Sequence, residues 1–200
     1  LLLKLFIIGF IMIKNINCAN FLSCLRIVVV PILVILFFIS DQSPRIFLVF
    51  IFTIACLTDY LDGYVARKMN QVSDLGKFLD PVADKLLVIT SLLLVLFDYN
   101  SLIIFIPICI IVIREVLVSA LREWVAISNL KSTFSKGKTV DVNYIGKIKT
   151  FIQMLSIGFL LFDGSVFTID TYMIGLYGIY LAAFLSLISM IIYLGNVIRS

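Results

Sequence analysis

The sequence predicts an all-α integral membrane protein with six transmembrane helices, an N-terminal juxtamembrane or interfacial helix, and both termini in the cytoplasm. Three observations predict this class: the apolar composition, six long apolar runs and an uneven distribution of charge. Hydrophobic residues make up 62% of the 200 residues and charged residues only 14%, whereas a soluble domain has roughly 45–50% and about 25%. A soluble core of this size cannot hide so many apolar side chains, so lipid must surround most of the chain. The composition excludes a soluble enzyme, a nucleic-acid-binding module and a disordered chain, but it admits a transporter or a membrane-embedded enzyme.

Six apolar runs approach the length of a membrane-spanning helix, which is about 20 residues. In chain order they are Phe21–Ser40, Arg45–Leu61, Leu75–Phe97, Leu102–Val125, Ile145–Phe162 and Thr171–Ile198. Short loops are expected on one side of the membrane at Asp41–Pro44, Asp98–Ser101 and Asp163–Asp170. The other side would carry the loops Tyr64–Asp74 and Ala126–Tyr144. An even number of spans places both termini on that second side.

Basic residues gather on the side of the termini. Arg45 is the only one of the 16 lysines and arginines assigned to the side of the three short loops, which also carries four of the 12 acidic residues. The remaining 15 bases therefore lie with the termini. Because loops rich in lysine and arginine stay in the cytoplasm, we expect the termini and the functional face there.

The first 13 residues form an apolar stretch that is too short to span a bilayer. We expect Leu1–Ile13 to be an interfacial helix or part of an upstream extension. Lys14–Ser23 would continue it along the cytoplasmic surface. The expected organisation is an N-terminal extension and juxtamembrane segment over residues 1–20, followed by one six-helix domain over residues 21–200.

Four aspartates lie where the second and third spans reach the cytoplasmic side. Asp59 and Asp62 are three residues apart and Asp80 and Asp84 are four apart, so each pair shares a helix face. A carboxylate at the bilayer centre costs about 2.5–3.5 kcal/mol, so four of them need cations or water. The chain has no histidine and no CxxC pair, which leaves oxygen ligands suited to Mg²⁺ or Mn²⁺. The alternative, helix-end acids paired with nearby bases, would explain only one or two of the four.

Small residues and one arginine lie in the same segment. Gly63, Ala66 and Gly76 allow a bulky ligand to approach the helix backbone, although each one alone also suits helix packing in a membrane. Arg67 supplies a positive charge one turn beyond the second aspartate, which suits a diphosphate. Ser73 is equally suited to cap the N-terminus of the third span.

The whole segment resembles the signature of the CDP-alcohol phosphatidyltransferase family. It reads Asp59-x2-Asp62-Gly63-x2-Ala66-Arg67-x8-Gly76-x3-Asp80-x3-Asp84, and all eight fixed positions match. The resemblance implies six transmembrane helices, a homodimer, and transfer of a substituted phosphoryl group from a CDP-linked donor to an alcohol with release of CMP.

The resemblance also implies a role for each matched residue. Asp59, Asp62 and Asp80 would be metal ligands, and Asp84 would be the general base and would also touch a metal. The cofactor would be Mg²⁺ or Mn²⁺, as two ions. The nucleotide and diphosphate site would be lined by Gly63, Ala66, Arg67, Ser73 and Gly76.

A second group of charges lies in the fourth and fifth spans. Arg114 and Arg122 are eight residues apart and lie close to one helix face, while Lys147 and Lys149 open the fifth span. Arg114 lies far enough inside the apolar run to need a partner or an anionic substrate. We expect Arg114, Arg122 and Lys147 to form a basic pocket that faces the metal site and binds a phosphate on the acceptor alcohol. The alternative is positive-inside anchoring, which is the preferred interpretation of Lys149.

Two stretches narrow the choice of acceptor. Ile113–Trp124 and Gly146–Thr150 resemble bacterial members of the family that use sn-glycerol 3-phosphate. This resemblance covers about residues 17–198. It implies transfer of the phosphatidyl group from CDP-diacylglycerol to sn-glycerol 3-phosphate, giving phosphatidylglycerophosphate and CMP, at the cytoplasmic face of a bacterial inner membrane. Before the first span, Ala19 and Ser23 replace the family's usual Pro and Thr.

Alternatives remain open at this stage. A sister enzyme would use inositol phosphate, serine or phosphatidylglycerol, the last giving cardiolipin, and the metal motif does not distinguish these acceptors. A divalent-cation transporter would place acidic or polar residues near the middle of several spans, but the first, fifth and sixth spans contain almost none. A catalytically silent protein of this fold is disfavoured because all four aspartates and Arg67 are present.

Overall fold

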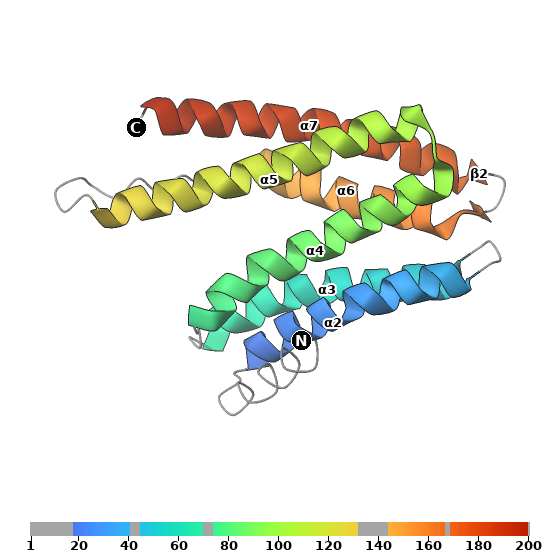
Figure 1. The fold of residues 1–200 in the computed structure, drawn as a ribbon, viewed down its shortest axis with the longest axis horizontal. Helices are drawn as coiled ribbons and strands as arrows, with labels where there is room; N and C mark the ends of the chain where they lie inside the picture. The colour runs from blue at the N-terminus through green and yellow to red at the C-terminus, as the bar shows by residue number, and fades with distance from the viewer. Residues whose placement is uncertain (1–17, 41–44, 70–73, 132–143, 167–168, 200) are drawn as a thin grey trace, which may run out of the picture. The chain divides into compact units, whose positions relative to one another are not determined.

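A computed structural model describes residues 18–40, 45–69, 74–131, 144–166 and 169–199. Within these ranges the chain forms six helices and one pair of two-residue strands (Figure 1). The helices are α2 (Cys18–Ile39), α3 (Ile46–Met69), α4 (Asp74–Tyr99), α5 (Leu102–Lys131), α6 (Tyr144–Phe162) and α7 (Thr171–Arg199). The strands β1 (Ser165–Val166) and β2 (Ile169–Asp170) pair antiparallel between α6 and α7. The predicted all-α class is confirmed, and the interfacial segment Leu1–Ile13 lies outside the described residues.

Each predicted span coincides with one helix, but two of the helices continue several residues into predicted loops. The sequence predicts loops from Tyr64 and Ala126, whereas α3 continues to Met69 and α5 to Lys131. The predicted loop boundaries are wrong because they follow the end of the apolar run. Alanine, arginine, lysine and leucine form helices in water as readily as in lipid, so the helix does not stop where the hydrophobicity does.

The helices expose apolar surface in the way that a membrane protein does. Leu102–Val125 of α5 and Thr171–Gly195 of α7 are long and apolar enough to cross a bilayer, and shorter apolar segments lie in α2, α3 and α6. Phe47, Leu102 and Tyr177 are each more than 70% exposed. Large exposed apolar patches are rare on soluble monomers. The membrane character is therefore supported, while six complete spans remain a prediction.

Short polar residues set the ends of the helices at two turns. Asn100 follows α4 with φ 40° and Asp163 follows α6 with φ 44°, a left-handed conformation that Asn and Asp tolerate better than most residues. Ser101 then accepts a backbone N–H from the first turn of α5 at 3.3 Å. Asp170 caps α7 in the same way at 2.9 Å. These residues allow the chain to reverse direction within a few positions.

The chain divides into two compact units. The first comprises Leu1–Asp41 with Phe47–Thr90, and the second comprises Gln42–Ile46 with Ser91–Ser200. The boundary therefore falls inside α4. In the first unit Leu33 of α2, Phe52 of α3 and Leu87 of α4 are almost completely buried. In the second unit α5 and α6 each pack against α7 (Figure 1). Its most buried core residues include Leu92, Ile104, Ile111, Ile157, Leu160 and Ile179.

Small residues bring α6 and α7 close together in the second unit. Gly178 lies against Ser156, and a Cβ carbon on Gly175 would stand 2.6 Å from Cγ of Leu160. Small residues serve this purpose in membrane helices because they let the backbones approach. The sequence alone does not tell whether Gly178 packs within one chain or between two chains. The structure places it against α6 of its own chain.

One end of the second unit is held by a polar group that we call the Arg45 clasp, made of Arg45, Asp98, Tyr99 and Asp163. The Arg45 guanidinium donates to both carboxylate oxygens of Asp98, at 2.6 and 2.9 Å. The Tyr99 hydroxyl donates to Asp163 at 3.1 Å. Burial, together with the charge of Asp163, raises the pKa of Tyr99, so its hydroxyl keeps its proton and remains a donor. The backbone N–H of Arg45 also donates to the carbonyl of Phe162 at 3.0 Å.

Candidate active site

The predicted acidic segment lies on two helices of the first unit. Asp59 and Asp62 fall within α3, and Asp80 and Asp84 fall within α4. Separations of three and four residues place each pair on one helix face. Of these four side chains the described part of the structure includes only Asp84. The meeting of the two acidic faces, and the metal site they would build, therefore remain predictions.

The predicted nucleotide-binding residues lie in the same two helices, apart from one. Gly63, Ala66 and Arg67 belong to α3 and Gly76 belongs to α4. Their side-chain positions, and Ser73 as a whole, lie outside the described residues. Their roles at a nucleotide or diphosphate site remain predictions.

The structure pairs Asp84 with a residue to which the sequence analysis assigned no role. Arg26 of α2 donates from Nη1 to Oδ1 of Asp84. The Arg26 side chain is 1% exposed, whereas the Asp84 side chain is 41% exposed. The expected general base therefore contacts a buried cation, while its own side chain is partly exposed. The signal in the sequence was an arginine inside an apolar run, which is costly without an anionic partner.

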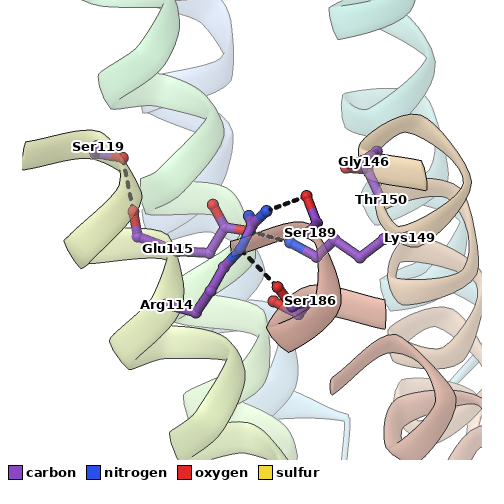
Figure 2. A network of polar contacts seen from close by, with 8 residues as sticks. All are labelled: Arg114, Glu115, Ser119, Gly146, Lys149, Thr150, Ser186 and Ser189. Carbon is purple, nitrogen blue, oxygen red and sulfur yellow. Dashed lines mark hydrogen bonds and ion pairs between the residues drawn. The ribbon is translucent and has the colours of Figure 1, made fainter. Parts of the chain in front are cut away.

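A polar group that we call the cationic cluster joins three helices of the second unit (Figure 2). It consists of Arg114 and Glu115 from α5, Lys149 from α6, and Ser186 and Ser189 from α7. Arg114 and Lys149 are 8% and 1% exposed. The Arg114 guanidinium donates to the Ser186 carbonyl at 3.2 Å, to Oγ of Ser189 at 2.9 Å and to Oε1 of Glu115 at 3.3 Å. Nζ of Lys149 donates to the same Glu115 oxygen.

The cationic cluster holds more N–H donors than its neighbours accept. An arginine has five N–H donors and a lysine has three. Hydrogen bonds among the described residues use three donors of Arg114 and one of Lys149, so four of the eight remain. These remaining N–H groups belong to nitrogens that each have one partner already, and they are able to donate to a further acceptor. The cluster is therefore suited to a ligand that brings several acceptor oxygens.

The charges of the cluster point to the same kind of ligand. Two cations, Arg114 and Lys149, share one carboxylate, Glu115, so the described part of the cluster has a positive surplus. Charges attract more strongly in a buried site than in water because the effective dielectric constant is lower. A phosphate group meets both requirements, since it is anionic and rich in acceptors.

The structure changes the choice of lysine in this region. The sequence assigns Lys147 to the basic pocket and Lys149 to simple anchoring, but Lys149 lies in the cationic cluster, so the anchoring assignment is wrong. Lys149 shares one face of α6 with Gln153 and Ser156, all of which are buried. Ser156 of this stripe lies against Gly178 of α7. The side chain of Lys147 lies outside the described residues.

Arg122 lies two turns beyond Arg114 on α5. Its side chain is exposed, and its guanidinium carbon lies 5.7 Å from the centre of the Tyr193 ring on α7. No hydrogen bond among the described residues joins Arg122 to the cationic cluster. Its part in a common pocket with Arg114 remains a prediction.

Sequence reasoning missed the buried uncharged polar residues of α6 and α7. It treated the fifth and sixth spans as nearly free of polar groups, whereas Gln153, Ser156, Ser186 and Ser189 are buried there. The available signal was their spacing. Positions 149, 153 and 156 recur at four and three residues, and positions 186 and 189 at three, which places each set on one helix face.

Comparisons with known proteins show the family to which the chain belongs. Residues 16–194 match the family described as CDP-alcohol phosphatidyltransferase. A protein of Wigglesworthia glossinidia brevipalpis is 38% identical over 179 residues, which cover 90% of this chain and 93% of the relative. Proteins of Haemophilus influenzae and Salmonella choleraesuis are 39% and 37% identical, each over 89% of this chain, with 91% and 93% of the relative covered. All three relatives are named CDP-diacylglycerol–glycerol-3-phosphate 3-phosphatidyltransferase. The chain belongs to the CDP-alcohol phosphatidyltransferase family.

Proposed function

We propose that this chain transfers the phosphatidyl group of CDP-diacylglycerol to sn-glycerol 3-phosphate, giving phosphatidylglycerophosphate and CMP. The observation that carries the proposal is the cationic cluster, in which two buried cations share a single carboxylate. The names of the relatives support the same donor and acceptor.

The cationic cluster favours an acceptor that itself carries a phosphate. Arg114 and Lys149 would bind that phosphate through N–H donors that their neighbours leave over, with Arg122 and Lys147 adding positive charge nearby. Serine has a carboxylate but no phosphate, so it would bring the cluster fewer acceptor oxygens and less negative charge. Inositol phosphate and phosphatidylglycerol remain as competitors, because both carry a phosphate.

In the proposed reaction a hydroxyl oxygen of the acceptor attacks the phosphorus of the phosphatidyl group. An O–P bond forms to the acceptor, and the P–O bond to the CMP phosphate breaks, so CMP leaves with that oxygen. Asp84 would accept the hydroxyl proton as general base. The buried Arg26 supports this role because it holds one oxygen of the Asp84 carboxylate while the side chain stays accessible.

A divalent metal is general in this family, and the acidic segment suits one. Asp59, Asp62, Asp80 and Asp84 offer only carboxylate oxygens, the ligands that Mg²⁺ and Mn²⁺ prefer. We propose that they hold two such ions, which when bound would neutralise the diphosphate and the leaving phosphate. We propose that the nucleotide and diphosphate site is lined by Gly63, Ala66, Arg67, Ser73 and Gly76.

The proposed setting is a bacterial inner membrane, with six spans, both termini in the cytoplasm and the active site on the cytoplasmic face. The bacterial relatives and the exposed apolar side chains support a membrane protein. The distribution of bases supports the orientation. The proposed assembly is a homodimer of the six-helix domain, residues 21–200, preceded by an extension over residues 1–20.

One assay tests the whole proposal. Purified protein in detergent is given CDP-diacylglycerol, Mg²⁺ or Mn²⁺, and one acceptor at a time: sn-glycerol 3-phosphate, inositol phosphate, serine or phosphatidylglycerol. We expect CMP release and a phosphatidylglycerophosphate product with the first acceptor only. CMP release with another acceptor alone would assign the chain to a sister activity, and metal uptake into vesicles without CMP release would favour a transporter.

A further inference from the structure

We infer that Glu115 is a positioning residue for the acceptor, which holds Lys149 and Arg114 in the arrangement that binds the acceptor phosphate. This inference rests on the proposed function and adds a residue that neither the family signature nor the predicted basic pocket contains. It also assigns the α6 part of that pocket to Lys149.

One oxygen of Glu115 serves both cations. Oε1 accepts from Nζ of Lys149 and from Nη1 of Arg114, the latter at 3.3 Å. Lys149 comes from α6, while Glu115 and Arg114 are neighbours on α5. Glu115 therefore fixes the position of Lys149 on α6 relative to Arg114 on α5 (Figure 2).

Without Glu115 the position of Lys149 would not be maintained. The Lys149 side chain is 2% exposed, and a buried ammonium group with no anionic partner is strongly disfavoured. A lysine has a long flexible stem, so its ammonium group would move toward water and away from Arg114. Repulsion between the two cations acts in the same direction.

The backbone and Oγ contacts on α7 explain why Glu115 would act mainly through Lys149. Arg114 keeps its bonds to the Ser186 carbonyl and to Ser189 whether or not Glu115 is charged. Lys149 has only the Glu115 carboxylate as a hydrogen-bond partner among the described residues. A change at Glu115 would therefore leave Arg114 in place and release Lys149.

Two effects of a Glu115→Gln substitution have opposite signs, which makes the test decisive. If Glu115 only offsets positive charge, its removal strengthens the attraction for an anion and lowers the KM for the acceptor. If Glu115 positions Lys149, its removal raises that KM, because the ammonium group leaves the site. The sign of the change in KM distinguishes the two roles.

The experiment measures CMP release by the full chain in detergent, varying sn-glycerol 3-phosphate and CDP-diacylglycerol in turn. For Glu115→Gln we expect the acceptor KM to rise about 10- to 100-fold, with the donor KM within about twofold. Inorganic phosphate should lose potency as a competitor of the acceptor by a similar factor. Glu115→Asp, which keeps the carboxylate, should restore part of the loss. The matched control is Glu123→Gln, an exposed residue eight positions further along α5, and it should leave both KM values unchanged.

A Glu115→Gln protein that fails to fold would be studied together with Lys149→Met, since removing the buried cation removes the uncompensated charge. The double variant should have the same acceptor KM as Lys149→Met alone. Independent, multiplying effects would overturn the inference, as would an unchanged or lowered acceptor KM in Glu115→Gln. A wild-type protein that uses inositol phosphate instead would refute the proposed acceptor but leave this test intact. A protein that uses only serine would refute both.

Discussion

The second unit contains two polar groups built around an arginine, and they differ in how many cations share one carboxylate. In the Arg45 clasp, both terminal nitrogens of one arginine meet both oxygens of one carboxylate. In the cationic cluster, an arginine and a lysine share a single carboxylate oxygen. In the clasp one carboxylate matches one arginine through two hydrogen bonds, as expected of a group that holds helices together. The cluster retains donors and charge, as expected of a group that binds a ligand.

The Asp84→Asn substitution tests whether the pair of Arg26 and Asp84 is catalytic or only structural. If Asp84 is the general base, Asp84→Asn should lower kcat by about 100- to 10,000-fold, because an amide does not take the proton of the acceptor hydroxyl. Size-exclusion behaviour and CDP-diacylglycerol binding should be largely kept. Near-normal turnover would place this pair with the clasp, as a structural contact.

The second prediction applies one substitution to the cluster. Arg114→Met removes the fork of donors but keeps an unbranched apolar side chain, so the acceptor KM should rise about 10- to 100-fold. Steady-state CMP release with varied sn-glycerol 3-phosphate measures it. An acceptor KM equal to that of the wild type would show that the cluster is as structural as the clasp.

Replacing the arginine of the clasp with methionine gives the matching test of that group. Arg45→Met leaves Asp98 without its bidentate partner and should cost about 1–3 kcal/mol of stability, which corresponds to a melting temperature lower by about 2–10 °C. Thermal unfolding in detergent measures the shift, and both KM values should stay unchanged in the folded fraction. A selective rise in the acceptor KM would remove the distinction between the two groups.

The fourth prediction concerns the rim of the cluster. Arg122 is exposed beside the ring of Tyr193. An exposed charge contributes less to the binding free energy of an anion than a buried one does. Arg122→Ala should therefore raise the acceptor KM only about two- to fivefold and leave the donor KM unchanged. Because solvent ions screen an exposed charge, 0.5 M salt should reduce the difference between wild type and variant. An effect as large as that of Arg114→Met would mean that Arg122 contacts the phosphate directly.

The helices were predictable from the sequence because apolar runs of membrane length have few other solutions. All six runs became helices, and the acidic pairs fell on the helices where the spacing placed them. The ends were less predictable. The helical backbone continues past the apolar run in α3 and α5, since polar helix formers maintain the same hydrogen bonds.

The cluster was only partly predictable, because a charge in a sequence does not state its partner. Arg114 was identified by its cost inside an apolar run. Lys149 was misassigned, since a lysine near a cytoplasmic helix end also satisfies positive-inside anchoring. Glu115 went unassigned because a carboxylate beside an arginine in sequence shows nothing of the lysine 34 residues further on that reaches it.

The backbone N–H of Arg45 donates to the carbonyl of Phe162, a residue that is synthesised much later. Arg45 and Ile46 belong to the second unit, although almost all of that unit is synthesised after them. This hydrogen bond therefore forms only after α3, α4 and α5 have been made and the last residue of α6 has been added. Assembly of the second unit is completed late in synthesis, and a chain truncated before α6 would expose Arg45 without this closing partner.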